Sequence, residues 1–301
     1  MSTAYPLTLQ QRVMQKGGVV RDLLALTKPG IVVMTLLTAG WGLGLAPRPP
    51  SWPTILACLL GTALSVGSAN AFNMWIERDV DRFMTRTRTR PLPDGRMKPI
   101  VALVFATVLG IASIFVLALW VNALTAVLST LAIAIYALAY TPMKRWSPAA
   151  LPVGAVSGAV PPLLGWTAAT SSLSAPGLLL FGVLFTWQLP HFLAISIFRK
   201  DEYDRAGIRI VPTVYGHRAA VRLIVASSVA MLLVSAAVAL TDAVGLPYLI
   251  AATTIGGAGI AFALRGLRSN AGERWARRYF FATLGYLPLL AAGMFVDVML
   301  G

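Results

Sequence analysis

Residues 72 to 98 hold the side chains in this sequence that are best suited to bind a metal ion and phosphate groups. Three acids fall within five positions of this stretch, and seven cations share it. The acids are Glu77, Asp79 and Asp81, and the cations are Arg78, Arg82, Arg86, Arg88, Arg90, Arg96 and Lys98. Residues spaced by four lie on one face of a helix, so Asn73, Glu77 and Asp81 are predicted to form a row.

Two carboxylates in such a row repel each other, and a divalent cation would relieve that repulsion. Mg²⁺ prefers oxygen ligands and usually takes one or two carboxylates together with phosphate oxygens of a substrate. The neighbouring arginines can hold the same phosphates through paired hydrogen bonds. We therefore predict a Mg²⁺–diphosphate site with Asn73, Glu77 and Asp81 as metal ligands. The alternative is a solvated loop of mixed charge.

A second acidic cluster, Asp201, Glu202 and Asp204, follows the sixth apolar segment and has cations on both sides. Two acidic loops at helix ends favour a facing pair of metal–phosphate sites. In this interpretation Asp201 and Asp204 are the metal ligands, with Glu202 as an open alternative, and Arg199 and Lys200 contact the diphosphate. Helix capping with exposed charge is the alternative for this loop.

The elements that must position these residues are predicted to be membrane helices. Apolar residues make up 57% of the chain and charged residues 12%, with a mean hydropathy of +0.74. A soluble domain carries about twice that share of charge. The net charge of +14 is explained by cationic loops on one side of a membrane, so we expect no nucleic-acid partner. The single cysteine, Cys58, excludes a disulfide within the chain, and the first 29 residues lack the pattern of a signal peptide.

Nine apolar segments, each close to the roughly 20 residues that span a bilayer, predict an all-α protein with nine transmembrane helices. They lie near residues 29–47, 53–77, 100–119, 122–140, 150–169, 177–198, 218–240, 246–265 and 275–297. The two largest charged loops fall at matching places four helices apart, which indicates a bundle around one central cavity. Of the 25 Lys and Arg residues, all but Arg48 fall on alternate connections. This asymmetry predicts a cytoplasmic N-terminus and cytoplasmic charged loops. Glycine clusters at 154–158 and 256–259 are predicted to mark contacts between helices.

Two further positions have polar side chains suited to chemistry. Lys144 and Arg145 follow the fourth segment and are predicted to neutralise a departing diphosphate, although cytoplasmic loops are cationic in any case. His191 follows Pro190 inside the sixth segment, where ionisable residues are functional candidates. It could ligate a haem iron, act as a general base, or be a packing residue.

The run Asn73-x-x-x-Glu77-x-Asp79-x-Asp81, followed by Arg86-Thr87 and Arg90-Pro91, resembles the first acidic motif of the UbiA superfamily of intramembrane prenyltransferases. Four other stretches are similar to the branch of that superfamily that farnesylates haem. They are residues 26–29 (LTKP), 140–145 (YTPMKR), 158–166 (GAVPPLLGW) and 187–212, which begins WQLPHF. The resemblance implies one transmembrane domain over residues 28–301 after a cytoplasmic segment at 1–27.

It also implies a Mg²⁺-dependent transfer of farnesyl from farnesyl diphosphate to the vinyl group of haem B, which gives haem O for a haem-copper oxidase. The expected setting is the lipid bilayer of the bacterial inner membrane, with the active site on the cytoplasmic side. Haem A synthase and oxidase assembly factors are the expected protein partners. The residues implied are Asn73, Glu77, Asp81, Lys144 and Arg145 for catalysis, Lys28, Arg86, Arg90, Arg199 and Lys200 for diphosphate, and His191 and Trp187 for haem.

Two features depart from the family pattern. Glu77 stands where the family usually has aspartate, and the second loop lacks the Asp-x-x-x-Asp spacing. Two other functions stay open at this point: a prenyltransferase with an aromatic acceptor such as a quinone precursor, and a transporter. Transporters place polar groups near the bilayer midplane, whereas here the charges gather at helix ends.

Overall fold

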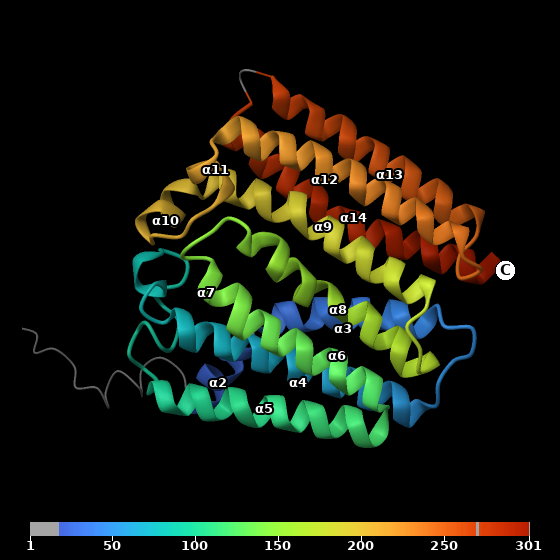
Figure 1. The fold of residues 1–301 in the computed structure, drawn as a ribbon, viewed down its shortest axis with the longest axis horizontal. Coiled ribbons are helices and arrows are strands. Elements are labelled where there is room, and N and C mark those ends of the chain that lie inside the picture. Colours follow the sequence, from blue (N-terminus) through green and yellow to red (C-terminus); the bar gives the residue numbers. More distant parts are fainter. Residues whose placement is uncertain (1–17, 269–270, 301) are drawn as a thin grey trace, which may run out of the picture.

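In the computed structural model, which describes residues 18–268 and 271–300, long helices lie side by side along most of the chain (Figure 1). The long helices are α3 (Pro29–Gly44), α4 (Trp52–Glu77), α5 (Pro99–Trp120), α6 (Ala123–Ala134), α8 (Ala150–Thr170), α9 (Ala175–Phe198), α12 (His217–Ala237), α13 (Leu246–Leu264) and α14 (Glu273–Leu300). The short ones are α2 (Val19–Thr27), η1 (Asp81–Phe83), η2 (Ile135–Tyr140), α7 (Thr141–Met143), α10 (Lys200–Arg205), α11 (Val211–Val214), η3 (Val238–Leu240) and η4 (Arg265–Leu267). The predicted all-α class is confirmed.

Within the described ranges, seven helices are long and apolar enough to cross a membrane, and α2 with α3, bent by 45° at Lys28, make up to eight. The chain is therefore a multi-pass membrane protein. The helix α8 occupies the remaining predicted segment with 21 residues but is not among those seven or eight. The count of nine spans stays a prediction.

The side chains of α5 show why the bundle is stable in lipid. Its large residues Val104, Ile111 and Phe115 are exposed, whereas its small residues Ala106 and Ser113 are buried against neighbouring helices. The Ser113 hydroxyl donates a hydrogen bond to the Gly61 carbonyl of α4 at 2.8 Å. Small residues inside and large apolar residues outside are typical of membrane helices, which associate through close packing rather than through water exclusion.

The predicted glycine contacts are confirmed at Gly154, Gly158 and Gly256, whereas a Cβ atom at Gly257 or Gly259 would have no neighbour closer than 4.0 Å. A Cβ atom added at Gly154 would lie 2.6 Å from the Tyr140 ring, one at Gly158 would lie 2.1 Å from the Gln188 amide oxygen, and one at Gly256 would lie 2.6 Å from Leu232. In each case the missing side chain leaves the space that a neighbouring helix fills.

A close backbone approach joins α3 to α8. A Cβ at Gly165 would lie 1.9 Å from the carbonyl oxygen of Ala39, and one at Gly42 would lie 2.0 Å from that of Pro162. Backbone atoms cannot move aside as a flexible side chain can, so this crossing tolerates no larger residue.

We expect Gly165→Ala to destabilise the protein by at least about 2 kcal/mol, because the added methyl group must push the two helices apart. A thermal melt of the detergent-solubilised protein, followed by size-exclusion chromatography, measures this loss. Gly40→Ala, two residues from Gly42 and with nothing within 4 Å of its added Cβ, is the control and should melt at or above the wild-type temperature. Equal melting of both variants would contradict the crossing described here.

The connections that carry most of the cations lie at one end of the bundle (Figure 1). The α4–α5 connection, the α6–α8 connection with α7, and the α9–α12 connection with α10 and α11 all gather there. Arg48 lies in the α3–α4 connection at the opposite end. The predicted segregation of charge is therefore present in the fold, and it brings the two acidic loops to the same end.

Candidate active site

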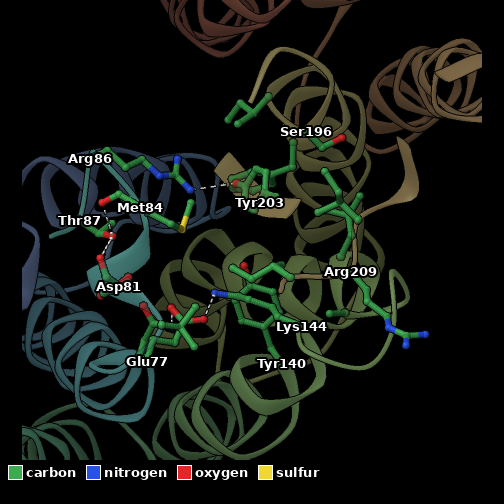
Figure 2. A pocket seen from close by; sticks show the side chains of 18 of the residues that line it. Glu77, Asp81, Met84, Arg86, Thr87, Tyr140, Lys144, Ser196, Tyr203 and Arg209 are labelled. Atoms are coloured by element: carbon green, nitrogen blue, oxygen red, sulfur yellow. Dashed lines mark hydrogen bonds and ion pairs between the residues drawn. The ribbon is translucent and has the colours of Figure 1, made fainter. Parts of the chain in front are cut away.

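A cavity of about 310 Å³ lies at the charged end of the bundle, lined in part by residues of the α4–α5 and α9–α12 connections (Figure 2). Its charged lining consists of two carboxylates and five cationic residues: Glu77, Asp81, Lys28, Arg86, Arg90, Lys144 and Arg209. The guanidinium group of Arg209 points away from the other labelled side chains (Figure 2). The other four cations outnumber the two carboxylates, so the cavity favours an anionic ligand.

The last turn of α4 supplies the centre of this lining. Asn73 Nδ2 donates a hydrogen bond to Glu77 Oε2 at 2.8 Å, which confirms that these two residues share one helix face. Lys28 Nζ donates to Asn73 Oδ1 at 3.0 Å, and Lys144 Nζ donates to Glu77 Oε1 at 2.8 Å. Lys28 adopts a left-handed backbone conformation with φ of 53°. Such strain at a non-glycine residue is often associated with a functional site, and here it lies where α2 meets α3.

Asp81 lines the cavity but, contrary to the prediction, it does not lie on the same helix as Asn73 and Glu77. The helix α4 ends at Glu77, and Asp81 begins the short 3₁₀ helix η1. Its side chain is 4% exposed and accepts a hydrogen bond from Arg90 Nη1 at 2.7 Å. The Thr87 hydroxyl donates to the Asp81 backbone carbonyl at 2.7 Å and closes the loop. Burial raises the pKa of Asp81, and the Arg90 guanidinium opposes that rise only in part.

Lys144 is positioned by a distortion of the preceding helix. Residues Ile135–Tyr140 form the π-helix η2, and the Thr141 hydroxyl donates to the Tyr136 carbonyl at 2.7 Å. Tyr136 and Tyr140 both line the cavity, and Lys144 Nζ lies 4.3 Å from the centroid of the Tyr140 ring. Burial alone would lower the pKa of Lys144, but the Glu77 carboxylate holds that pKa above its usual value. Lys144 is therefore a fixed cation. π-Helical turns are rare and frequently occur at functional sites.

The two acidic loops meet above the cavity. The Arg86 guanidinium donates to the Tyr203 hydroxyl at 2.9 Å and lies 5.3 Å from the centroid of its ring (Figure 2). The Arg209 backbone N–H donates to the Lys144 carbonyl at 3.0 Å. The first contact joins the α4–α5 connection to the α9–α12 connection, and the second joins the α9–α12 connection to the α6–α8 connection. Together they fix the mouth of the cavity.

The structure does not bring Asp201, Asp204, Lys200 or Arg145 to the cavity lining. Asp204 accepts hydrogen bonds from Lys200 Nζ at 2.6 Å and from the Thr213 hydroxyl at 2.5 Å. These hydrogen bonds, first that of Lys200, hold the pKa of Asp204 below its usual value. The Asp204 carboxylate is thus already hydrogen-bonded by Lys200 of its own helix and by Thr213. A metal or diphosphate role for these four residues stays a prediction.

Arg199, a further predicted diphosphate contact, does not line this cavity either and pairs instead with Glu202 at 2.6 Å.

His191 and Trp187, the predicted haem contacts, lie outside the cavity and pack against α14. His191 Nδ1 lies 2.8 Å from the Thr283 hydroxyl, and Trp187 Nε1 donates to the Thr283 carbonyl at 2.8 Å. The two rings stack with centroids 4.7 Å apart, and the His191 ring lies 4.6 Å from that of Phe280. His191 is 7% exposed. His191 Nδ1 and Trp187 Nε1 therefore both have hydrogen-bond partners within the protein. Direct contact of either residue with haem stays a prediction.

The cavity fits a hard divalent cation that is coordinated jointly by the protein and by a substrate. Asn73, Glu77 and Asp81 supply two carboxylates and an amide oxygen, which is the donor chemistry that Mg²⁺ takes. Within the described residues, no group of three His, Cys, Asp or Glu side chains lies close enough to hold a metal ion. A substrate phosphate would therefore have to complete the coordination.

Sequence reasoning assigned no role to four residues that line the cavity: Tyr136, Tyr140, Tyr203 and Arg209. Tyr140 and Tyr203 do lie in stretches that resemble the family, which was the available signal. Tyr136 lies four residues before Tyr140 and so on the same face of the helix, but it falls outside those stretches.

The fold and the cavity together define a polytopic helical membrane protein with a cavity rich in basic residues at one end of its bundle. The sequence matches the UbiA prenyltransferase family over residues 35–285. A relative from Sorangium cellulosum (strain So ce56), named protoheme IX farnesyltransferase, is 49% identical over 251 residues, which cover 83% of this chain and 89% of that protein.

Two solved structures are similar in fold. A UbiA homolog from Aeropyrum pernix K1 has a TM-score of 0.72 at 20% identity, over 89% of this chain and 98% of that one. A UbiA homolog from Archaeoglobus fulgidus, bound to GPP and Mg²⁺, has a TM-score of 0.61 at 17% identity, over 91% and 99%. This chain belongs to the UbiA prenyltransferase family.

Proposed function

We propose that this protein transfers the farnesyl group of farnesyl diphosphate to a vinyl group of haem B, giving haem O and diphosphate. The observation that carries the proposal is the cavity whose lining holds more basic residues than carboxylates, in a chain whose relative at 49% identity is named protoheme IX farnesyltransferase. The name of that relative disfavours an aromatic acceptor. The match to the UbiA prenyltransferase family disfavours a transporter.

The reaction begins with cleavage of the bond between C1 of the farnesyl chain and the diphosphate oxygen. The leaving diphosphate keeps the electron pair, and Arg86, Arg90, Lys28 and Lys144 stabilise its negative charge from fixed positions. The π electrons of the vinyl group then form the new carbon–carbon bond to C1. Water adds to the cation left beside the porphyrin ring and loses a proton, which gives the hydroxyethylfarnesyl side chain.

Mg²⁺ held by Asn73, Glu77 and Asp81 with diphosphate oxygens would neutralise charge on the leaving group. This role is supported by the donor set and by a family member with Mg²⁺ and GPP bound. The cations that already pair with Glu77 and Asp81 prevent the two carboxylates from repelling the substrate before it binds.

The proposed setting is the bacterial inner membrane, with the cavity on the cytoplasmic side. The gathering of cationic connections at one end of the bundle supports this orientation. The apolar lining contributed by residues such as Ile31, Leu151 and Phe192 suits an allylic chain and keeps water from the cation. Transfer of the product to haem A synthase or to oxidase assembly factors is part of the proposal.

The test is to incubate the purified protein with haem B, farnesyl diphosphate and Mg²⁺ and to identify the product by mass spectrometry. We expect haem O, and no product when Mg²⁺ is chelated. Formation of a prenylated quinone precursor but no haem O would overturn the proposed acceptor. Movement of a solute across proteoliposomes without any prenyl transfer would overturn the enzyme class.

We expect Tyr203→Phe to raise the KM for farnesyl diphosphate several-fold with little change in melting temperature. The variant keeps the ring under Arg86 but loses the hydroxyl that orients its guanidinium group, so Arg86 is less well positioned to contact the diphosphate. Tyr215→Phe is the control, since Tyr215 is 65% exposed and does not line the cavity. An unchanged KM in Tyr203→Phe would show that Arg86 does not depend on this contact.

A further inference from the structure

A second cavity, of about 210 Å³, lies between the C-terminal end of α9 and the first turns of α14. We call it the arginine–phenylalanine groove, and its defining residues are Arg86, Phe198, Arg199, Arg277, Phe280 and Phe281. It adjoins the first cavity, because Arg86 and Ile195 line both. The reaction outlined above uses none of the other residues of this groove.

The groove combines a fixed aromatic surface with guanidinium groups. The rings of Phe198 and Phe280 meet edge to face with centroids 5.7 Å apart, and those of Phe280 and Phe281 are 5.2 Å apart. The guanidinium carbons of Arg277 and Arg199 lie 5.4 and 5.9 Å from the centroid of Phe198. A flat apolar ligand with carboxylates at one edge matches this combination.

The charges of the groove are only partly balanced. Arg199 pairs with Glu202 at 2.6 Å, and Arg86 donates to the neutral Tyr203 hydroxyl. Arg277 makes no salt bridge to any acid in residues 18–268 and 271–300. A cation over an aromatic ring, without an acid beside it, is well placed to bind an incoming anion.

We propose that the arginine–phenylalanine groove binds the propionate carboxylates of the haem acceptor, with Arg277 as the main contact. This inference rests on the proposed function. Haem carries its propionates at one edge and the vinyl groups on the other pyrrole rings, so propionates in the groove direct a vinyl group past Ile195 into the diphosphate cavity. His191 then supports the groove from behind, because its ring packs on Phe280.

The test is a titration of the purified full-length protein with haem B and with its dimethyl ester, followed by the Soret absorption. The ester removes the propionate charges and keeps the ring. We expect the wild type to bind haem B about tenfold more tightly than the ester, which is the size expected for loss of a charged hydrogen bond. Arg277→Gln should bind haem B about tenfold more weakly than the wild type and bind the ester as the wild type does.

Two other substitutions make the test specific. Arg274→Gln is the matched control, because Arg274 is exposed on the same helix and does not line the groove; it should bind both ligands as the wild type does. Arg277→Lys keeps the charge but loses the paired donors, so its haem affinity should be intermediate.

The proposal is overturned if Arg277→Gln binds haem B as the wild type does, or if it loses affinity for haem B and the ester equally. A variant with unchanged haem affinity that is no longer stabilised by phosphatidylglycerol vesicles would assign the groove to a lipid phosphate instead. Haem O formation by the wild type is measured in parallel. Its absence overturns the proposed function, whereas normal turnover with unchanged haem binding by Arg277→Gln overturns only the groove.

Discussion

Glu77→Gln and Asp81→Asn are each expected to lower the rate of haem O formation by orders of magnitude while the protein stays folded in the membrane. Both carboxylates line the cavity, at 9% and 3% exposure, and each is held by a cation. They are the donors to which we assign the metal, and metal stabilisation of a leaving group contributes several kcal/mol. Single-turnover rates at saturating Mg²⁺ and farnesyl diphosphate measure the effect.

Asp79→Asn is the matched control for this experiment. Asp79 lies between the two acids in sequence, but its side chain is 64% exposed and it does not line the cavity. It should turn over at close to the wild-type rate. Glu77→Asp, which restores the residue usual in the family, should retain activity with a changed Mg²⁺ requirement. Near-normal rates in Glu77→Gln and Asp81→Asn would remove these carboxylates from the site.

The spacing of polar residues along α4 predicted the centre of the site because it depends on local geometry alone. Side chains four residues apart on a helix lie close enough to interact, and Asn73 and Glu77 form a hydrogen bond of 2.8 Å. The same rule explains why the second loop differs from the prediction. Lys200 and Asp204 are also four apart and pair with each other at 2.6 Å, so this acid is neutralised within its own helix rather than turned to the cavity.

The parts of the site that could not be predicted depend on contacts between segments far apart in the chain. No sequence pattern predicts the π-helical turn at Ile135–Tyr140. The ring of Tyr140 fits in the bundle because Gly154 of α8 has no side chain, since a Cβ there would lie 2.6 Å from that ring. His191 was predicted to contact haem. Its orientation toward Thr283 follows from the packing of α9 on α14.

Lys144 and Arg145 were predicted together, and the structure separates their roles. Lys144 lines the cavity and pairs with Glu77, whereas Arg145 is exposed and lies outside the lining. Lys144→Met is therefore expected to reduce turnover strongly, and Arg145→Met to leave it close to the wild-type rate. The loss in Lys144→Met has two sources: a missing cation beside the diphosphate, and a Glu77 carboxylate left buried without its partner, which typically destabilises a protein by about 3–5 kcal/mol.

The double variant Lys144→Met/Glu77→Gln separates these two sources. Replacing both partners removes the unpaired charge, so its melting temperature should recover toward that of the wild type. Its turnover should stay low, because the cation and the carboxylate that act on the diphosphate are both absent. Melting curves and single-turnover rates of the two single variants and the double variant complete the cycle. Recovery of turnover together with stability would mean that Lys144 only balances Glu77 and does not act on the leaving group.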